Sequence, residues 1–262
     1  MMSLLSFVII ASTVVRRSES FSTTDSWRLR VTPTKIPLAA SRRDFFAATV
    51  VLGPHNAVAS ERVPEARIKA ELSKVPFFAI TTSDGDSPYF TAIAKNDSPI
   101  AYFFSERSDA EALLPQVRKT TDPAAIVSAI PFDQAWELVS NPNEKEYGGL
   151  FQLQASRRQV VNANGNSGQD QKLDRDNRVP LFFDRRVVIP GARADASFPF
   201  FFKYEDLKRV YAAGSDGLSP EEKKLAGPLA VEVTTLDRAV SAMREGSIEN
   251  AGRIVFVSSE KF

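Results

Sequence analysis

Two stretches of the chain share one pattern, in which a short aromatic run is followed by apolar residues at helical spacing. The first run covers residues 101–105 and the second covers 198–202. A continuous apolar run of four or five residues, bounded by polar residues, is typical of a strand that is buried on both faces. After the second run, Leu207, Val210 and Tyr211 fall on one face of a helix. We therefore predict a strand followed by a helix in both places.

The ends of these two helices carry candidate signals of their own. Ser108, with Glu111 three positions later, matches the capping-box pattern of a helix start. Gly214 stands where a glycine commonly ends a helix. We therefore expect the first helix to begin next to Ser108 and the second to end near Gly214.

Further segments repeat at a constant separation, which indicates an internal duplication. Three pairs of segments match at an offset of 104 residues, and the two aromatic runs match at an offset of 98. Matches that recur in order at one offset are the mark of a repeated structural unit. The matched pairs are 75–78 with 179–182, 129–135 with 233–239, and 148–153 with 252–257.

The duplication predicts an α+β fold made of two similar halves, each with the element order β-β-β-α-β-α-β. The first half covers residues 75–155 and the second covers 179–262, and the polar, glycine-containing segment 156–178 links them. Two such halves pack most simply about a pseudo-twofold axis, with the sheets in the centre and the helices outside.

The first 59 residues have the composition of targeting signals. Residues 4–15 are an apolar run of the length found in signal peptides, and we place that signal peptide at 1–20; a buried strand or helix is the alternative. Residues 21–40 are rich in serine, threonine and basic residues, as transit peptides are. Residues 41–59 contain Arg42-Arg43, a short apolar stretch and a final Ala-Val-Ala, which indicates a candidate twin-arginine signal. The folded domain is predicted to cover 60–262.

Composition excludes several classes of chemistry from this domain. The chain has no cysteine, and its single histidine, His55, lies in the predicted presequence. Disulfides, thiol nucleophiles, Cys/His zinc sites and histidine-dependent catalysis are therefore excluded. Gly148-Gly149 is not followed by the lysine and hydroxyl residue of a phosphate-binding loop, and the slightly acidic balance of 60–262 gives no argument for nucleic acid. We expect no cofactor, no metal and no nucleic-acid partner.

The order of several apolar motifs is similar to that of a known family. The motifs are Val-Pro-Phe-Phe at 75–78, Tyr-Phe-Phe-Ser at 102–105, Val-Pro-Leu-Phe at 179–182, the run 200–207, the run 230–236 and the closing Arg-Ile-Val-Phe-Val-Ser-Ser at 253–259. Together they resemble the family of the 22 kDa subunit of the translocon at the inner envelope membrane of chloroplasts, which has cyanobacterial relatives. The resemblance covers roughly residues 63–262. The junction Ser20-Phe21 resembles the bipartite presequences of algae with complex plastids.

The resemblance implies a two-winged fold with apolar pockets beside a central sheet, and a non-enzymatic role in plastid protein import. It implies that the protein holds unfolded precursor proteins as a chaperone or tether and contacts translocon components of the envelope. The implied compartment is the intermembrane space of the plastid envelope. A working twin-arginine signal would instead carry the protein to the thylakoid lumen, where the partners would be translocon components of the thylakoid.

The aromatic strands supply the candidate client site. Three consecutive rings in one strand must point to both of its faces. If a helix covers one face, the other needs a partner, which is either the second half of the protein or a client. We therefore predict that Phe200 and Phe202, with Phe104 from the matching strand, border a groove for extended apolar segments of unfolded proteins. The alternative for each ring is that it fills the core.

Charged pairs and two other functional classes complete the hypotheses. The dibasic pairs Arg157-Arg158 and Arg185-Arg186 suit peripheral association with lipid headgroups or an acidic partner, but solvated turns and strand ends are the favoured interpretation. A lumenal hydrolase or isomerase with a carboxylate or Ser-Lys site is one alternative function. A structural scaffold that dimerises through its aromatic strands is the other. The sequence does not determine an oligomeric state.

Overall fold

A computed structural model describes residues 49–50, 62–85, 87–93, 98–141, 148–166, 172–173, 178–189, 197–248 and 251–258. The predicted signal peptide at 1–20 and transit peptide at 21–40 lie outside these residues, as does most of the candidate twin-arginine segment at 41–59. From that last segment, strand β1 (Thr49–Val50) is described.

The strands of the first half form one sheet, in which β5, β2 and β4 are neighbours and both β6 and β3 also pair with β4. β2 is antiparallel to β5 and to β4, whereas β4 and β6 run parallel. Every residue of β2 is buried, as expected for a strand covered on both faces. The strands are β2 (Pro76–Thr81), β3 (Ala92–Ile93), β4 (Pro99–Phe104), β5 (Ile126–Pro131) and β6 (Leu150–Gln154).

The second half repeats this sheet. Its order is β10-β7-β9-β11, with β7 antiparallel to β10 and to β9, and with β9 parallel to β11. Strand β8, the counterpart of β3 in the element order, pairs with β1. The strands are β7 (Pro180–Phe183), β8 (Val187–Val188), β9 (Phe198–Phe201), β10 (Glu232–Thr235) and β11 (Ile254–Val257). The repeated order and directions confirm the predicted α+β fold of two duplicated halves.

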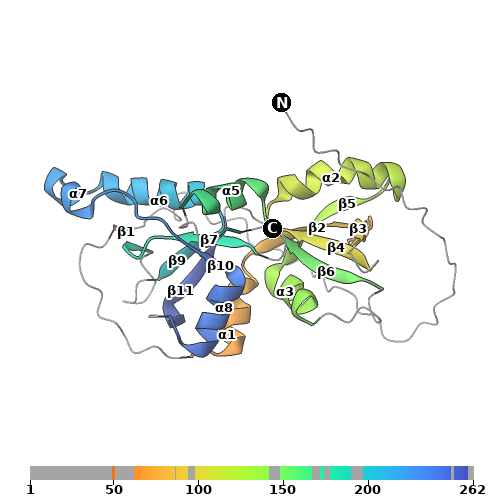
Figure 1. The fold of residues 1–262 in the computed structure, drawn as a ribbon, viewed down its shortest axis with the longest axis horizontal. Coiled ribbons are helices and arrows are strands. Elements are labelled where there is room, and N and C mark those ends of the chain that lie inside the picture. Colours follow the sequence, from red (N-terminus) through yellow and green to blue (C-terminus); the bar gives the residue numbers. More distant parts are fainter. Residues whose placement is uncertain are drawn as a thin grey trace.

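Helices cover both faces of the two sheets (Figure 1). Among the described elements, one group of helices lies along one face and a second group along the other, so the sheets are central and the helices outside, as predicted. No described helix is both long and apolar enough to span a membrane. The first group is α2 (Arg107–Thr120), α5 (Arg157–Asn166), α6 (Tyr204–Asp216) and α7 (Pro220–Ala226), and the second is α1 (Glu65–Leu72), α3 (Phe132–Ser140) and α8 (Leu236–Glu245).

The strand ladders correct the predicted register of the duplication. The β2–β5 and β7–β10 ladders match at the predicted offset of 104. Phe78 pairs with Phe104, however, and the equivalent Phe182 pairs with Phe201 rather than with Phe202. The aromatic strands therefore match at 97 residues, not 98, and β6 and β11 match at 103, not 104.

This one-residue correction decides which face each ring occupies, because side chains alternate along a strand. Phe104 and Phe201 are equivalent, and each packs in a cluster beneath the helix that follows its strand. Phe103 and Phe200 are also equivalent, and both point to the opposite face, into a central cluster.

The two helices end close to the predicted places, but both predicted cap residues are wrong. Helix α2 begins at Arg107 with Glu106 as its N-cap, so Ser108 lies inside the helix and Glu111 instead pairs with Arg107 at 2.8 Å. The second helix continues past Gly214 to Asp216. A complete capping box does occur elsewhere, between Ser219 and Glu222 at the start of α7.

The segment predicted as a linker contains a helix. Helix α5 occupies its first part, although the sequence there is polar. Gln159, Val160 and Ala163 form a buried face at i, i+1 and i+4 spacing, and this face fixes the helix against the rest of the protein.

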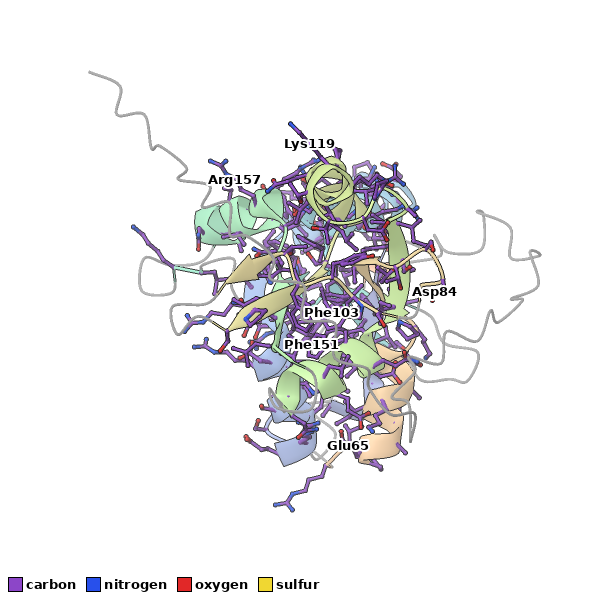
Figure 2. All side chains as sticks on the ribbon, turned by 90° about the vertical axis from the view of Figure 1, so that its right-hand side faces the viewer. Glu65, Asp84, Phe103, Lys119, Phe151 and Arg157 are labelled. Carbon is purple, nitrogen blue, oxygen red and sulfur yellow. The ribbon has the colours of Figure 1, made fainter. Side chains whose placement is uncertain are left out.

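The two halves share one hydrophobic core, which lies between the sheets and helices α1, α3 and α8. Phe77 of the first half stacks on Phe132 at 4.4 Å between ring centroids, and its edge meets Phe202 of the second half at 6.0 Å. Figure 2 shows Phe103 and Phe151 in this interior, between the helical layers. Their rings are stacked 5.6 Å apart. The halves therefore depend on each other for burial.

Gly149, just before β6, is a position where the packing leaves no room for a side chain. A Cβ there would lie 2.6 Å from the carbonyl oxygen of Pro99 and would overlap the ring of Phe90. We expect Gly149→Ala to lower the free energy of unfolding by about 1–3 kcal/mol, as measured by urea denaturation. Gly165→Ala is the matched control, since nothing lies within 4 Å of its Cβ. Equal stability of the two variants would contradict this packing.

Candidate functional site

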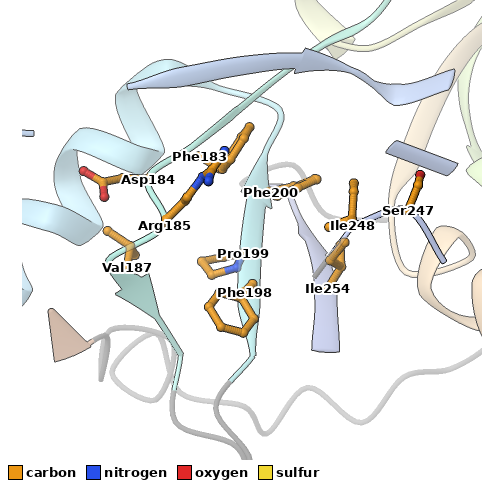
Figure 3. Close-up of a pocket in the computed structure, with 10 residues that line it drawn as sticks. All are labelled: Phe183, Asp184, Arg185, Val187, Phe198, Pro199, Phe200, Ser247, Ile248 and Ile254. Atoms are coloured by element: carbon orange, nitrogen blue, oxygen red, sulfur yellow. The ribbon is translucent and has the colours of Figure 1, made fainter. Parts of the chain in front are cut away.

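A cavity of about 510 Å³ opens beside the sheet of the second half. Figure 3 shows its lining side chains on the β7–β8 turn, on β9, and on β11 with the segment that precedes it. Phe183 and Phe200 lie with their ring centroids 4.6 Å apart, and Ile248 and Ile254 line the cavity on the other side of Phe200 from Phe183. Ser247 is exposed at the edge. The lining is predominantly apolar, and its polar groups are confined to a few side chains.

The turn between β7 and β8 is held by a buried ion pair. The carboxylate of Asp184, 3% exposed, accepts hydrogen bonds from the guanidinium and backbone N–H of Arg186 and from the backbone N–H of Ala230. Arg186 in turn donates to the carbonyl oxygens of Ala226 and Pro228. These bonds attach the cavity's turn to the segment between α7 and β10.

Arg185, the other arginine of this dibasic pair, lies at the protein surface. Arg185 is exposed and forms an ion pair with Glu232 at 2.9 Å. It lines the cavity together with Val187 of β8. The pair lies in a turn, as the favoured interpretation predicts, but only Arg185 is solvated, because Arg186 is held by Asp184 and by backbone carbonyls.

Burial alone would raise the pKa of Asp184, but the hydrogen bonds from Arg186 and Ala230 outweigh it and lower the pKa. A carboxyl whose folded-state pKa lies below its unfolded value of about 3.9 adds stability above that pH, and the stability is lost as the pH falls through the folded-state pKa. We expect Asp184→Asn to reduce the unfolding free energy at pH 7 by about 3 kcal/mol, because Arg186 is left without its partner.

Urea denaturation across pH 7 to 3 measures both parts of this prediction. The gap between the wild type and Asp184→Asn should narrow below about pH 4, where the wild type also loses the charged pair. Glu221→Gln removes an exposed carboxylate on α7 and should leave the curve unchanged. A constant gap at all pH values would show that the charge of Asp184 does not hold the turn.

The corresponding position in the first half is filled by aromatic rings. Phe151 occupies the place of Ile254 and stacks on Phe103, the counterpart of Phe200. Phe90 adds a third ring, 5.9 Å from Phe151. The duplicated halves therefore differ in how this ladder is filled: the first half pairs Phe151 with Ala101, and the second pairs Ile254 with Phe198.

The structure does not bring the three predicted client residues together. Phe200, 5% exposed, lines the cavity. Phe202 is buried in the central core against Phe77 and Phe256, and Phe104 is buried beneath α2 in a separate cluster. The three rings do not border a single groove, because the register differs by one residue from the predicted one. Their role in binding a client stays a prediction.

Sequence reasoning singled out Arg185 and the run 198–202 but missed several other cavity residues. Ser247 and Ile248 follow helix α8 and carry no motif, and Phe183 reads only as part of an apolar strand. The available signal was the difference between Phe151 and Ile254 in the two repeats, and it becomes visible only with the corrected offset.

A smaller, polar cavity of about 260 Å³ lies where the first turns of α2 and α6 meet α5. Gln159, 2% exposed, is its centre: its amide group donates to Glu106 at 3.2 Å and to Glu205 at 3.0 Å, and its oxygen accepts from the backbone N–H of Tyr204. This residue links the two halves.

The acidic group at this junction is held in its charged form. Burial would raise the pKa of Glu205, but hydrogen bonds from Gln159 and Asn162 and the charge of Arg158, 2.8 Å away, lower it. A carboxylate with a lowered pKa suits a fixed ion pair better than a general acid at neutral pH. The cluster around Gln159 and Glu205 therefore favours a structural role in connecting the two halves over the carboxylate enzyme site considered above.

Two solved structures are similar to the chain in fold. One is "Tic22 from Plasmodium falciparum", with 24% sequence identity and a TM-score of 0.57, covering 73% of this chain and 91% of that one. The other is "Anabaena Tic22 (protein transport)", with 18% identity and a TM-score of 0.52, covering 75% of this chain and 93% of that one. No curated protein matches the chain.

A family model matches far more of the sequence than any single motif does. The match is to the Tic22-like family and runs from residue 4 to residue 261. The resemblance drawn from the apolar motifs is thereby confirmed. The chain belongs to the Tic22-like family, a family of components of plastid protein import.

Proposed function

We propose that this protein holds apolar segments of unfolded precursor proteins during import into the plastid, as a chaperone or tether, and that the cavity of the second half is its client site. The observation that carries the proposal is an open, apolar cavity of about 510 Å³ at a position that the first half fills with rings. The cavity lies within the range of volumes that proteins use to bind small groups.

The size and lining of the cavity suit weak, reversible binding. Burial of one large apolar side chain contributes about 1.5–3 kcal/mol. A client held by one or two such side chains would be released without an energy source. Arg185, which is paired with Glu232, adds a charged group to the apolar lining, as in other binding sites whose core is apolar and whose rim is polar.

Family membership supports the plastid as the site of action, and we place the protein in the intermembrane space of the envelope. There it would receive precursors between two membranes and contact translocon components. The Anabaena neighbour is described as a protein of protein transport, which is in keeping with this role.

The proposal is tested by diluting an unfolded plastid precursor into buffer without nucleotide and following its aggregation by light scattering. The wild type should suppress aggregation. Ile248→Asp, which places a charge in the cavity, should not. Leu225→Asp is the matched control, because Leu225 is 79% exposed on α7 and does not line the cavity. Circular dichroism establishes first that both variants are folded.

Two results would refute the proposal. If the wild type does not reduce scattering, the protein does not hold clients under these conditions, and the scaffold or enzyme alternatives gain weight. If Ile248→Asp and Leu225→Asp suppress aggregation equally well, clients bind elsewhere on the protein.

A further inference from the structure

Among the described strands of the second half, β8 is the one that does not belong to the sheet β10-β7-β9-β11. It follows the turn fixed by Asp184 and Arg186, and one of its two residues, Val187, lines the cavity. Within the described residues its ladder partner is β1, which joins it as an antiparallel strand from far away in the sequence. A distant segment of the chain therefore occupies the edge of the cavity's own wall.

The direction of the backbone groups shows which edge of β8 receives this strand. Ile189 exchanges both backbone hydrogen bonds with Ser197, so its N–H and C=O point toward the chain that leads into β9. Neighbouring residues in a strand direct these groups to opposite sides. The N–H and C=O of Val188 therefore point to the other side, where its partner is Thr49.

The segment that contributes β1 differs from the rest of the fold in its origin. Thr49–Val50 lies in the stretch predicted as part of a targeting signal, whereas the remaining described strands all lie within 76–257. The sequence around it, Ala-Ala-Thr-Val-Val-Leu at 47–52, is short, apolar and β-branched. It has the composition of the extended segments that a precursor exposes before it folds.

From these observations we infer that the outer edge of β8 is a strand-addition site, which Thr49–Val50 fills in the full chain and which an extended apolar segment of a client fills when Thr49–Val50 leaves. In such recognition the added strand gains backbone hydrogen bonds, and pockets beside the edge select its side chains. Here the pocket is the cavity that Val187 shares. The inference rests on the proposed function and names the way in which clients are recognised.

The test uses the full chain and a fluorescent peptide with the sequence of residues 45–54, followed by fluorescence anisotropy. In the wild type the tethered strand competes at a local concentration of order millimolar, so the free peptide should bind weakly. The variant Thr49→Pro loses the N–H that faces Val188, which should release the tethered strand. The peptide should then bind this variant at least tenfold more tightly than it binds the wild type.

Two peptides supply the matched controls. A peptide with Thr49→Pro lacks the same N–H and should not bind the variant protein. A peptide with Val50→Pro carries the same ring one residue later, on an N–H that points away from β8, and should still bind. Equal binding of all three peptides would show capture by side chains alone and would overturn strand addition.

The remaining outcomes separate this inference from the proposed function. If Thr49→Pro suppresses aggregation as the wild type does but binds no peptide, strand addition is wrong and the client cavity stands. If the peptide binds the wild type and Thr49→Pro with the same affinity, the peptide uses a different surface and the inference is overturned.

Discussion

Replacement of Phe77 by alanine is expected to lower the free energy of unfolding by about 3–5 kcal/mol and to destabilise both halves together. Phe77 is fully buried, stacks on Phe132 of its own half and meets Phe202 of the other. Removal of a buried ring costs the lost burial and leaves a cavity. Because the core is shared, the loss should be felt on both sides of it.

Hydrogen exchange distinguishes a shared core from two separate ones. In Phe77→Ala, the amides of β7 and β9 should exchange faster by about the same factor as those of β2. Phe90→Ala serves as the control, since this ring is 37% exposed and its loss should cost far less. If only the first half loses protection in Phe77→Ala, the halves are independently stable and the single core is wrong.

The largest functional effect is expected from Ile254→Phe, which copies into the second half the residue that the first half has at the same place. Ile254 forms one wall of the cavity, and its counterpart Phe151 stacks on Phe103. A ring at 254 should occupy the space beside Phe200 that a client side chain would take. We expect client affinity to fall at least tenfold, which corresponds to about 1.4 kcal/mol.

The reverse exchange makes the comparison specific. Phe151→Ile removes a stacked ring from the first half and should reduce stability by about 1–3 kcal/mol without loss of client binding. Affinity is measured by titration with an unfolded, labelled precursor, after denaturation has shown that Ile254→Phe is folded. Unchanged affinity in folded Ile254→Phe would mean that the cavity is not where clients bind.

Much of the fold could be predicted because burial follows simple rules in this chain. Strand β2 is a continuous apolar run covered on both faces, and the 104-residue offset carries over to β7, β10 and α8 without a gap. These segments keep the same spacing in both halves, so their equivalence can be recognised from the sequence alone.

The register of the aromatic strands could not be found in the same way. The spacing from Phe78 to Phe104 in the first half differs from that between Phe182 and Phe201 in the second. The two positions of the second half that could be equivalent to Phe104 are Phe201 and Phe202. Both are phenylalanines, so residue identity does not distinguish them. The pairing of β7 with β9 distinguishes the two: it makes Phe201 the counterpart of Phe104. Both of these rings lie on the sheet face opposite to the one that carries Phe103 and Phe200.

The cavity has an isoleucine, Ile254, at the position where the first half has Phe151, and no motif indicates this difference. Its walls combine Phe183, Phe200 and Ile254 from three strands with Ile248 from the segment after α8. The sequence identified Phe200 as a candidate because of its aromatic neighbours. It could not show that the space beside this ring is open while the space beside Phe103 is filled.

The most direct test of the client cavity is photo-crosslinking from a reactive amino acid placed at position 247, on the cavity's edge, with position 225 on α7 as the control. Each protein is mixed with an unfolded plastid precursor and irradiated, and the covalent adducts are separated by mass. We expect a precursor adduct from position 247 and little or none from position 225. Adducts of equal yield from both positions, or none from 247 while aggregation is still suppressed, would contradict this expectation.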